Sequence, residues 1–316
     1  MDSLLVMRSL AAAGFLLAAS HGAAMAEAKL KAVASFSILG DMVAKVGGDR
    51  VVVTTLVGPD GDAHVYEPTP ADAKSVAEAN VFIVNGLSFE GWLERLTKSS
   101  GYAGPIVVAT KGIKAHKMAE EDGHDPDTHT KAKEHDQGHE DPHAWQSLKN
   151  GLVYVKNIAE GLCTADPQGC DRYKQNADRY SAEIEALDKK IRADIAKVTI
   201  EKRKVVTSHD AFGYFAGEYG VAFLAPQGIS TESEASAADV AELVRQIKKE
   251  NVTALFVENI SDPRLIEQIA RETSVKPGGR IYSDALSSKD GPASTYLDMF
   301  KHNGAALTSA MLGTGS

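Results

Sequence analysis

Residues 31–57 read KAVASFSILGDMVAKVGGDRVVVTTLV, and this stretch decides the fold. Its first seven residues form an apolar run that predicts a strand. The next eleven, ILGDMVAKVGG, predict a helix that stops at Gly47 and Gly48. The last seven, VVVTTLV, predict a second strand. Strand, helix and strand in this order predict a βαβ unit with parallel strands.

The same alternation continues along the chain. Thr69 and Pro70 have the residue types of a helix cap and a first helical residue, and a strand is predicted after that helix at residues 80–86. Residues 204–220 and 253–273 each predict strand, loop and helix, and Asp262 and Pro263 begin the second of these helices. Residues 279–287 predict a strand that runs into a loop. The sequence therefore predicts a second α/β unit in its last third.

Residues 171–198 lie between the two units and predict one long, charged helix. They have Tyr, Ile and Leu at helical spacing and contain no Gly or Pro, as suits a rigid connector. We therefore predict an α/β fold of two lobes, each a mainly parallel sheet flanked by helices, joined by one long rigid helix. The expected divisions are a signal peptide (1–26), an N-terminal lobe (27–170), a connecting helix (171–203) and a C-terminal lobe (204–316).

The composition narrows the class of protein. The 316 residues are enough for two domains, and a net charge of −9 argues against nucleic acid and anionic membrane surfaces as partners. Arg8, an apolar run and the small residues that end at Ala26 are typical of a signal peptide cleaved near Ala26, although a buried N-terminal helix is the alternative. We expect export to the periplasm. Cys163 and Cys170 should form a disulfide there, the alternative being two free thiols.

Residues 139–143, HEDPH, match the H-E-x-x-H motif of zinc proteases. That motif needs His139 and His143 one turn apart on a helix, and Pro142 between them is incompatible with a helix interior. Pro142 suits the first position of a helix, with Asp141 as its N-cap. We therefore interpret the match as accidental and expect no protease.

Four residues remain candidates for a metal site. His64, His143 and His209 lie in loops or at a helix start, and Asp284 follows the strand of residues 279–283. Ligands of open α/β sheets gather beyond the carboxyl ends of strands, although each His alone is more often a hydrogen-bonded loop residue. Glu258, at the end of another strand, is a weaker candidate for which a supporting or solvated role is expected.

Residues 114–141 break the alternation and contain almost no large apolar side chains, so we predict a mobile, histidine-rich loop. Five of its histidines are candidates for weak, auxiliary metal binding: His116, His124, His129, His135 and His139. They could raise the local concentration of metal. The alternative is a solvated spacer.

The chain resembles the extracytoplasmic solute-binding proteins of ABC importers for zinc and manganese. The matching stretches follow one another over nearly the whole chain after the signal: GPDGDAHVYEPTP, NGLSFEGWLERL, DPHAW, VVTSHDAFGYFA, ISTESEASAADV and YSDALSSKDGPASTYLDMFKHN. The resemblance implies a metal in the cleft between the lobes, bound by His64, His143, His209 and Asp284. The histidine-rich loop resembles the loop of the zinc-specific branch.

These expectations combine into one function. Three imidazoles and one carboxylate saturate tetrahedral Zn²⁺, whereas a catalytic zinc keeps one position for water. We therefore expect a monomeric carrier that is not an enzyme, holds one Zn²⁺ tightly with Mn²⁺ as a weak competitor, and delivers it to the membrane permease of an ABC importer. A periplasmic metallochaperone is a further possible partner. The alternatives are a manganese carrier of the same class and a zinc metallohydrolase.

Overall fold

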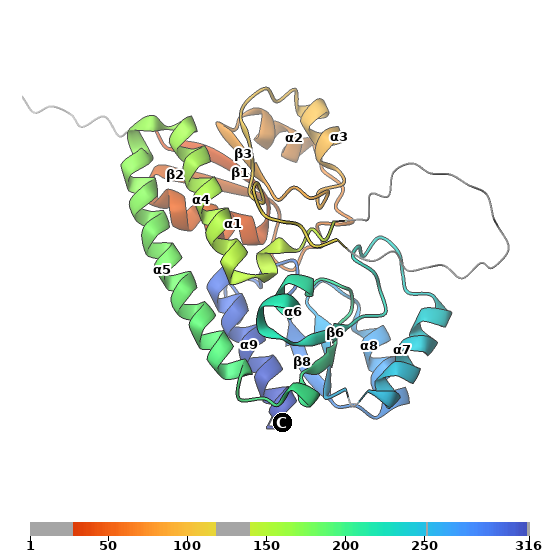
Figure 1. The fold of residues 1–316 in the computed structure, drawn as a ribbon. Helices are drawn as coiled ribbons and strands as arrows, with labels where there is room; N and C mark the ends of the chain where they lie inside the picture. The colour runs from red at the N-terminus through yellow and green to blue at the C-terminus, as the bar shows by residue number, and fades with distance from the viewer. Residues whose placement is uncertain (1–27, 118–139, 251, 315–316) are drawn as a thin grey trace, which may run out of the picture.

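The computed structural model describes residues 28–117, 140–250 and 252–314. The expected signal peptide and most of the histidine-rich loop lie outside the described residues. In the part that is described, no helix is both long and apolar enough to cross a membrane. Two lobes stand one above the other, and a long helix runs along both of them (Figure 1).

The N-terminal lobe contains a parallel sheet in the order β2-β1-β3-β4. Its strands are β1 (Leu30–Phe36), β2 (Val51–Val57), β3 (Val81–Val84) and β4 (Ile106–Val108). The helices of this lobe are α1 (Ser37–Gly47), α2 (Pro70–Ala77), α3 (Leu93–Ser100) and α4 (Leu148–Ala165). The predicted βαβ unit is β1-α1-β2, in which Leu30 pairs with Val51 and Phe36 with Val57.

The C-terminal lobe repeats this design with the strand order β6-β5-β7-β8, again parallel throughout. Its strands are β5 (Lys204–Val206), β6 (Ala222–Leu224), β7 (Ala254–Glu258) and β8 (Pro277–Ile281). Its helices are α6 (Gly213–Tyr219), α7 (Ala237–Lys249), α8 (Pro263–Thr273) and α9 (Tyr296–Leu312). The predicted α/β class with two mainly parallel sheets is therefore confirmed.

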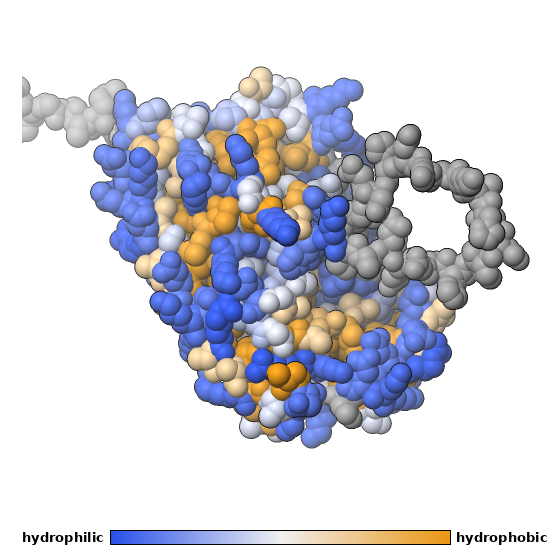
Figure 2. Space-filling model, viewed as in Figure 1, coloured by the Kyte–Doolittle hydropathy of each residue, from blue (hydrophilic) through white to orange (hydrophobic). Residues whose placement is uncertain are grey.

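Helix α5 (Cys170–Ile195) is the predicted connector, and its 26 residues pack against α1 and α4 of one lobe and α6 and α9 of the other. Its buried residues recur every three or four positions, as expected of one apolar stripe. They are Tyr173, Ala177, Tyr180, Ile184, Leu187, Ile191 and Ile195. The outer side of α5 is largely hydrophilic, as the left edge of the molecule shows (Figure 2). One continuous stripe therefore holds both lobes.

Local capping sets several helix ends as the sequence predicts. Thr69 accepts a hydrogen bond from the backbone of Asp72 and Pro70 is the first residue of α2. Asp262 caps α8 before Pro263 in the same way. Helix α1 ends at Gly47, and the following Gly48 has a positive φ of 58°, which residues with a Cβ rarely adopt. The turn from α4 to α5 contains the expected disulfide between Cys163 and Cys170.

The start of α4 differs from the prediction. The chain makes a short 3-10 turn at Ala144–Gln146, and α4 begins at Leu148 instead of Pro142. Ser147 caps the helix by accepting a hydrogen bond from the backbone of Asn150. The side chain of Asp141, which was expected to cap the helix, instead accepts the backbone N–H of His143 and contacts its ring. This local arrangement places His143 outside any helix.

Candidate metal centre

The four candidate donors meet between the lobes. His64 follows β2, His209 follows β5, and Asp284 follows β8, while His143 lies just before α4. Their ligand atoms all lie within 4.8 Å of one another. The structure therefore brings together all four residues that the sequence singled out, from segments far apart in the chain.

The spacing of the donor atoms suits a small tetrahedral cation. The Nε2 atom of His64 lies 3.3 Å from Nε2 of His143 and 3.2 Å from Oδ2 of Asp284. Nε2 of His209 lies 3.1 Å from the same Oδ2, and Nε2 of His143 lies 3.7 Å from Oδ1. Metal–ligand bonds of roughly 2.0–2.1 Å in a tetrahedron separate the donors by about 3.3 Å. Three of these four distances match that separation, and all four ligand atoms lie within 4.8 Å of one another.

Burial and unmet bonding capacity also indicate a cation. His143, His209 and Asp284 are fully buried, and His64 is 8% exposed. Both carboxylate oxygens of Asp284 and the Nε2 atom of His209 are buried without a hydrogen bond of good geometry. A buried carboxylate in this state is costly unless a positive charge compensates it. The donor set therefore fits a divalent metal ion.

The charges within the group shift two pKa values. Burial opposes ionisation of His209, but the negative charges of Glu258 and Asp284 outweigh burial and raise the pKa of His209 well above its ordinary value. Burial likewise opposes ionisation of Asp284, yet His209 and His143 hold the pKa of Asp284 well below its ordinary value. Without metal, a proton on His209 takes part of the cation's place.

His64 and His143 each lie in a local turn of the same kind. In both Asp62-Ala63-His64 and Asp141-Pro142-His143, the Oδ1 atom of the Asp accepts the backbone N–H of the His two residues later, at 2.9 Å. Oδ1 of Asp141 also lies 2.7 Å from the Nδ1 atom of His143. Neither aspartate was predicted from the sequence as a support for its histidine, although the repeated Asp-x-His spacing was a signal that could have found them.

Glu258 supports the third histidine. Its Oε2 atom lies 2.5 Å from Nδ1 of His209, and its Oε1 atom accepts the backbone N–H groups of Ser208 and His209. The carboxylate is fully buried at the end of β7. Of the two roles expected for Glu258, the structure therefore shows the supporting one and excludes the solvated one.

Aromatic residues enclose the group on the N-terminal side. Phe89 packs edge-on against His64, with ring centroids 4.9 Å apart, and Trp145 lies 5.2 Å from His143. The indole N–H of Trp145 donates to the carbonyl of Ser283, next to Asp284, and that of Trp92 donates to the carbonyl of Ala63, next to His64. These two bonds hold the backbone on either side of the cleft.

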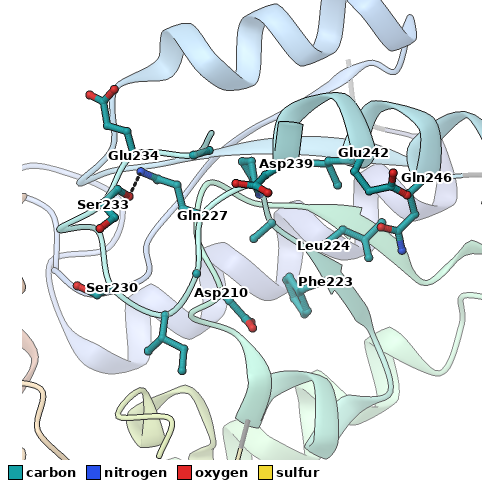
Figure 3. Close-up of a pocket in the computed structure, with 16 residues that line it drawn as sticks. Asp210, Phe223, Leu224, Gln227, Ser230, Ser233, Glu234, Asp239, Glu242 and Gln246 are labelled. Carbon is teal, nitrogen blue, oxygen red and sulfur yellow. Dashed lines mark hydrogen bonds between the residues drawn. The ribbon is translucent and has the colours of Figure 1, made fainter. Parts of the chain in front are cut away.

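The loop that joins β6 to α7 (residues 225–236, the β6–α7 loop) reaches across the cleft. Oγ1 of Thr231 donates a 2.6 Å hydrogen bond to Oδ2 of Asp62 in the other lobe. Within the loop, Gln227 donates to the carbonyl of Ser233 (Figure 3). The loop also contributes Glu232 to the wall of a surface cavity of about 510 Å³ that His64 borders. The His64 side of the group is therefore the side nearest to solvent.

A larger cavity, of about 610 Å³, lies between the β6–α7 loop and α7 (Figure 3). Its wall contains the acidic residues Asp210, Glu234, Asp239 and Glu242 but none of the four candidate donors. We place the function at the buried group rather than here, because this cavity gathers no such constellation of donors.

The histidine-rich loop has an ordered base. Lys117 and Glu140 form an antiparallel bridge, and the backbone N–H of Asp141 donates to the carbonyl of His116. The ring of His116 stacks on Tyr214 of α6 at 4.0 Å. These contacts hold the two ends of the segment for which a mobile loop is predicted. His124, His129, His135 and His139 lie outside the described residues.

The hydrolase alternative finds no support in this geometry. Asp284 occupies the fourth donor position, which a catalytic zinc would leave to water. Glu140, the residue that would be the general base in the H-E-x-x-H match, is exposed in the base of the loop. The motif is thus accidental, as the sequence indicated.

Comparison with known proteins agrees with the fold and the site. The chain is 32% identical over 274 residues to the manganese-binding lipoprotein MntA of Halalkalibacterium halodurans, covering 87% of this chain and 86% of that protein. It is 33% identical over 288 residues to the metal ABC transporter substrate-binding lipoprotein SloC of Streptococcus mutans, covering 88% and 89%. The solved structure of the periplasmic zinc binding protein TroA from Treponema pallidum matches with a TM-score of 0.80 and 27% identity over 90% of this chain and 99% of that chain.

Fold, site and relatives together define the class: this is a metal-binding, substrate-binding protein of the ABC transporter type, and not an enzyme. The chain belongs to the family described as ZnuA, zinc-uptake complex component A periplasmic, whose model matches residues 32–310. The relatives bear the names of different metals, so family membership alone does not select the cargo.

Proposed function

We propose that the protein captures Zn²⁺ outside the cytoplasmic membrane and delivers it to the permease of an ABC importer. His64, His143, His209 and Asp284 are the proposed ligands. The observation that carries the proposal is the donor set, three imidazoles and one carboxylate whose ligand atoms lie within 4.8 Å of one another in a buried cleft. A site that the protein saturates by itself suits carriage.

Manganese is the second candidate, because relatives such as MntA are named for it. Imidazole suits Zn²⁺, whereas Mn²⁺ prefers oxygen donors, and the Irving–Williams order places Zn²⁺ above Mn²⁺ at nitrogen and oxygen sites. A set of four protein donors also favours zinc over a metal that takes six ligands. These arguments support zinc as the cargo and manganese as a weak competitor.

The signal-like residues 1–26 and the names of the relatives, which are lipoproteins or periplasmic proteins, support export. The proposed protein works as a monomer in the periplasm, where its membrane partner can reach both lobes. The division into lobes at 27–170 and 204–316 with a connector between them is part of the same proposal.

The histidines beyond His116 are proposed as auxiliary, weak zinc ligands on the strength of their composition alone. His116 is less suited to this role, because its ring is stacked on Tyr214. Deleting residues 118–139 would keep the ordered base. The expected result is loss of weak zinc equivalents with the tight one retained, and an unchanged stoichiometry would leave the segment a spacer.

Competitive titration of parent protein and His209→Glu with Zn²⁺ and Mn²⁺ tests the cargo. We expect the parent to prefer zinc strongly and the variant to narrow the gap, mainly by weakening zinc. His64→Ala and His209→Ala test the ligands, since each removes one bond to the metal. A parent that holds both metals equally, or Ala variants that bind zinc like the parent, would overturn the proposal.

A further inference from the structure

The carboxylates that support His143 and His209 bond to their histidines in different ways. Asp141 uses one oxygen for both of its contacts with His143: Oδ1 accepts the backbone N–H at 2.9 Å and meets Nδ1 at 2.7 Å. Its Oδ2 is buried and has no hydrogen-bond partner among the described residues. One oxygen of Asp141 is therefore sufficient to orient His143.

The two oxygens of Glu258 contact different groups. Oε1 accepts the backbone N–H of Ser208 at 2.7 Å and that of His209 at 2.9 Å. Oε2 alone meets Nδ1 of His209, at 2.5 Å. This contact is bent away from the ideal line of the ring N–H, but two lone pairs do not approach so closely, so a hydrogen lies between the atoms. Oε1 of Glu258 therefore binds backbone N–H groups, and Oε2 binds the ring of His209.

The consequence concerns which ring nitrogen of His209 is free to bind metal. A carboxylate oxygen at Nδ1 keeps a proton there, so Nε2, which faces Asp284, is the nitrogen that gives up its proton and offers a lone pair to the metal. Resting on the function proposed above, we propose that Glu258 is the positioning residue that makes His209 a ligand, by fixing its tautomer through a carboxylate oxygen that no amide can replace.

The amide variant shows why. In Glu258→Gln, the amide oxygen must take the place of Oε1, because two backbone N–H groups donate to that position. An NH₂ group there would be a third donor with no acceptor. The NH₂ group then takes the place of Oε2 and donates to Nδ1 of His209. This moves the ring proton to Nε2, where it faces Asp284 and blocks metal binding.

Asp141→Asn is the matched control. It makes the same exchange of one oxygen for NH₂ and removes the same charge beside another candidate ligand. Its amide oxygen can keep both contacts of Oδ1, with the NH₂ in the place of the unpartnered Oδ2, so His143 keeps its tautomer. Any difference between the two variants therefore reports the tautomer and not the loss of a buried charge.

The experiment measures zinc affinity and the number of bound imidazoles. Substitutions behind a metal ligand cost on the order of 10–100-fold in affinity. We expect about 100-fold for Glu258→Gln and at most about tenfold for Asp141→Asn. In ¹⁵N-histidine protein loaded with ¹¹³Cd²⁺, the parent and Asp141→Asn should show couplings to the imidazoles of His64, His143 and His209. Glu258→Gln should lose the coupling to His209 alone.

The outcomes separate this inference from the proposed function. A parent without coupling to the three histidines would overturn the metal site itself. A second outcome would overturn the role of Glu258 alone. In it, the parent shows couplings to all three histidines, and Glu258→Gln keeps the coupling to His209 and binds zinc as tightly as Asp141→Asn does. If Glu258→Gln does not fold, the loaded parent still decides the matter. Its His209 must carry a proton on Nδ1, and a metal bound through Nδ1 would contradict the inference.

Discussion

Thr231 of the C-terminal lobe donates a 2.6 Å hydrogen bond to Asp62, and the other oxygen of the same Asp62 carboxylate accepts the backbone N–H of His64. One side chain thus links the β6–α7 loop to a candidate ligand in the opposite lobe. His64 is also the donor that borders a surface cavity. The bond therefore lies beside the donor nearest to solvent, where we expect the metal to leave.

Thr231→Val removes this bond and keeps the shape of the side chain. A hydrogen bond contributes about 1 kcal/mol net, so we expect zinc to dissociate about fivefold faster, with a smaller change in affinity because association also accelerates. Stopped-flow transfer of zinc to a chelator measures the rate. Thr164→Val is the control, because its hydroxyl bonds only within α4, to the carbonyl of Glu160. Equal rates for both variants and the parent would contradict a cross-lobe role for Thr231.

Zinc binding should release a proton from His209. The pKa of His209 in the metal-free protein lies well above the ordinary 6.5, because Glu258 and Asp284 outweigh burial. The ring is therefore protonated at neutral pH, and zinc must displace that proton from Nε2. We expect zinc affinity to fall about tenfold per pH unit below the raised pKa. Calorimetry in buffers of different ionisation enthalpy counts the proton, and a count of zero at pH 7 would refute the assignment.

The stability of the metal-free protein should depend on the same charges. The raised pKa of His209 stabilises the fold fully below about pH 6.5, and this contribution is lost as pH rises through the raised value. The lowered pKa of Asp284 stabilises above about pH 3.8, and this contribution is lost as pH falls through the lowered value. Metal-free protein should therefore be most resistant to urea between these limits. Asp284→Asn should flatten the profile on both sides, since it removes one charge of the pair.

Removing the metal should lower the unfolding temperature. A ligand that binds only the folded chain stabilises it by about 2.7 kcal/mol when its free concentration is 100 times Kd. For a chain of this size that corresponds to an increase of several degrees in Tm. Scanning calorimetry with buffered zinc and with a chelator measures the difference. The His209→Ala protein is the control and should lose most of the zinc-dependent shift, while a parent indifferent to zinc would contradict a tight site.

The disulfide should matter for stability and not for metal. Cys163 and Cys170 close a short loop between α4 and α5, away from the four donors. Loop entropy gives roughly 2.5 kcal/mol for a ring of this length. We expect the double variant Cys163→Ser, Cys170→Ser to lose about that much free energy of unfolding in urea. Its zinc affinity should equal that of the parent, and a large loss of affinity would show that the turn acts on the cleft.

The sequence predicts what depends on neighbours in the chain. The Thr69–Pro70 and Asp262–Pro263 helix starts are correct because capping is decided within one turn of helix. His209 and Asp284 were singled out because side chains after parallel strands gather at one edge of a sheet, and His64 and His143 because each lies in a loop before a predicted helix or at its start. The set of four as ligands is what the family resemblance implies. The start of α4 was missed because Asp141 and Ser147 both had the chemistry of a cap, and only the folded cleft gives Asp141 to His143.

The links between the lobes had no local signal. Thr231 and Asp62 are 169 positions apart, and Trp145 and Ser283 are 138 apart. Nothing in the residues around Thr231 distinguishes it from any other polar loop residue. The anchoring of His116 on Tyr214 is of the same kind, since it depends on α6 lying beside the base of the loop. Such contacts form only after both lobes have folded and packed against each other.

The order of the donors along the chain has a consequence for the direction of metal traffic. The last of the four donors, Asp284, comes 220 positions after the first, His64. A nascent or translocating polypeptide therefore cannot assemble the four donors until the chain from His64 to Asp284 has emerged and folded. A chain that crosses the membrane as an unfolded polymer would leave the zinc of the cytoplasm behind. It would acquire its affinity only on the outer side, so that synthesis of the carrier does not drain the compartment that the carrier serves.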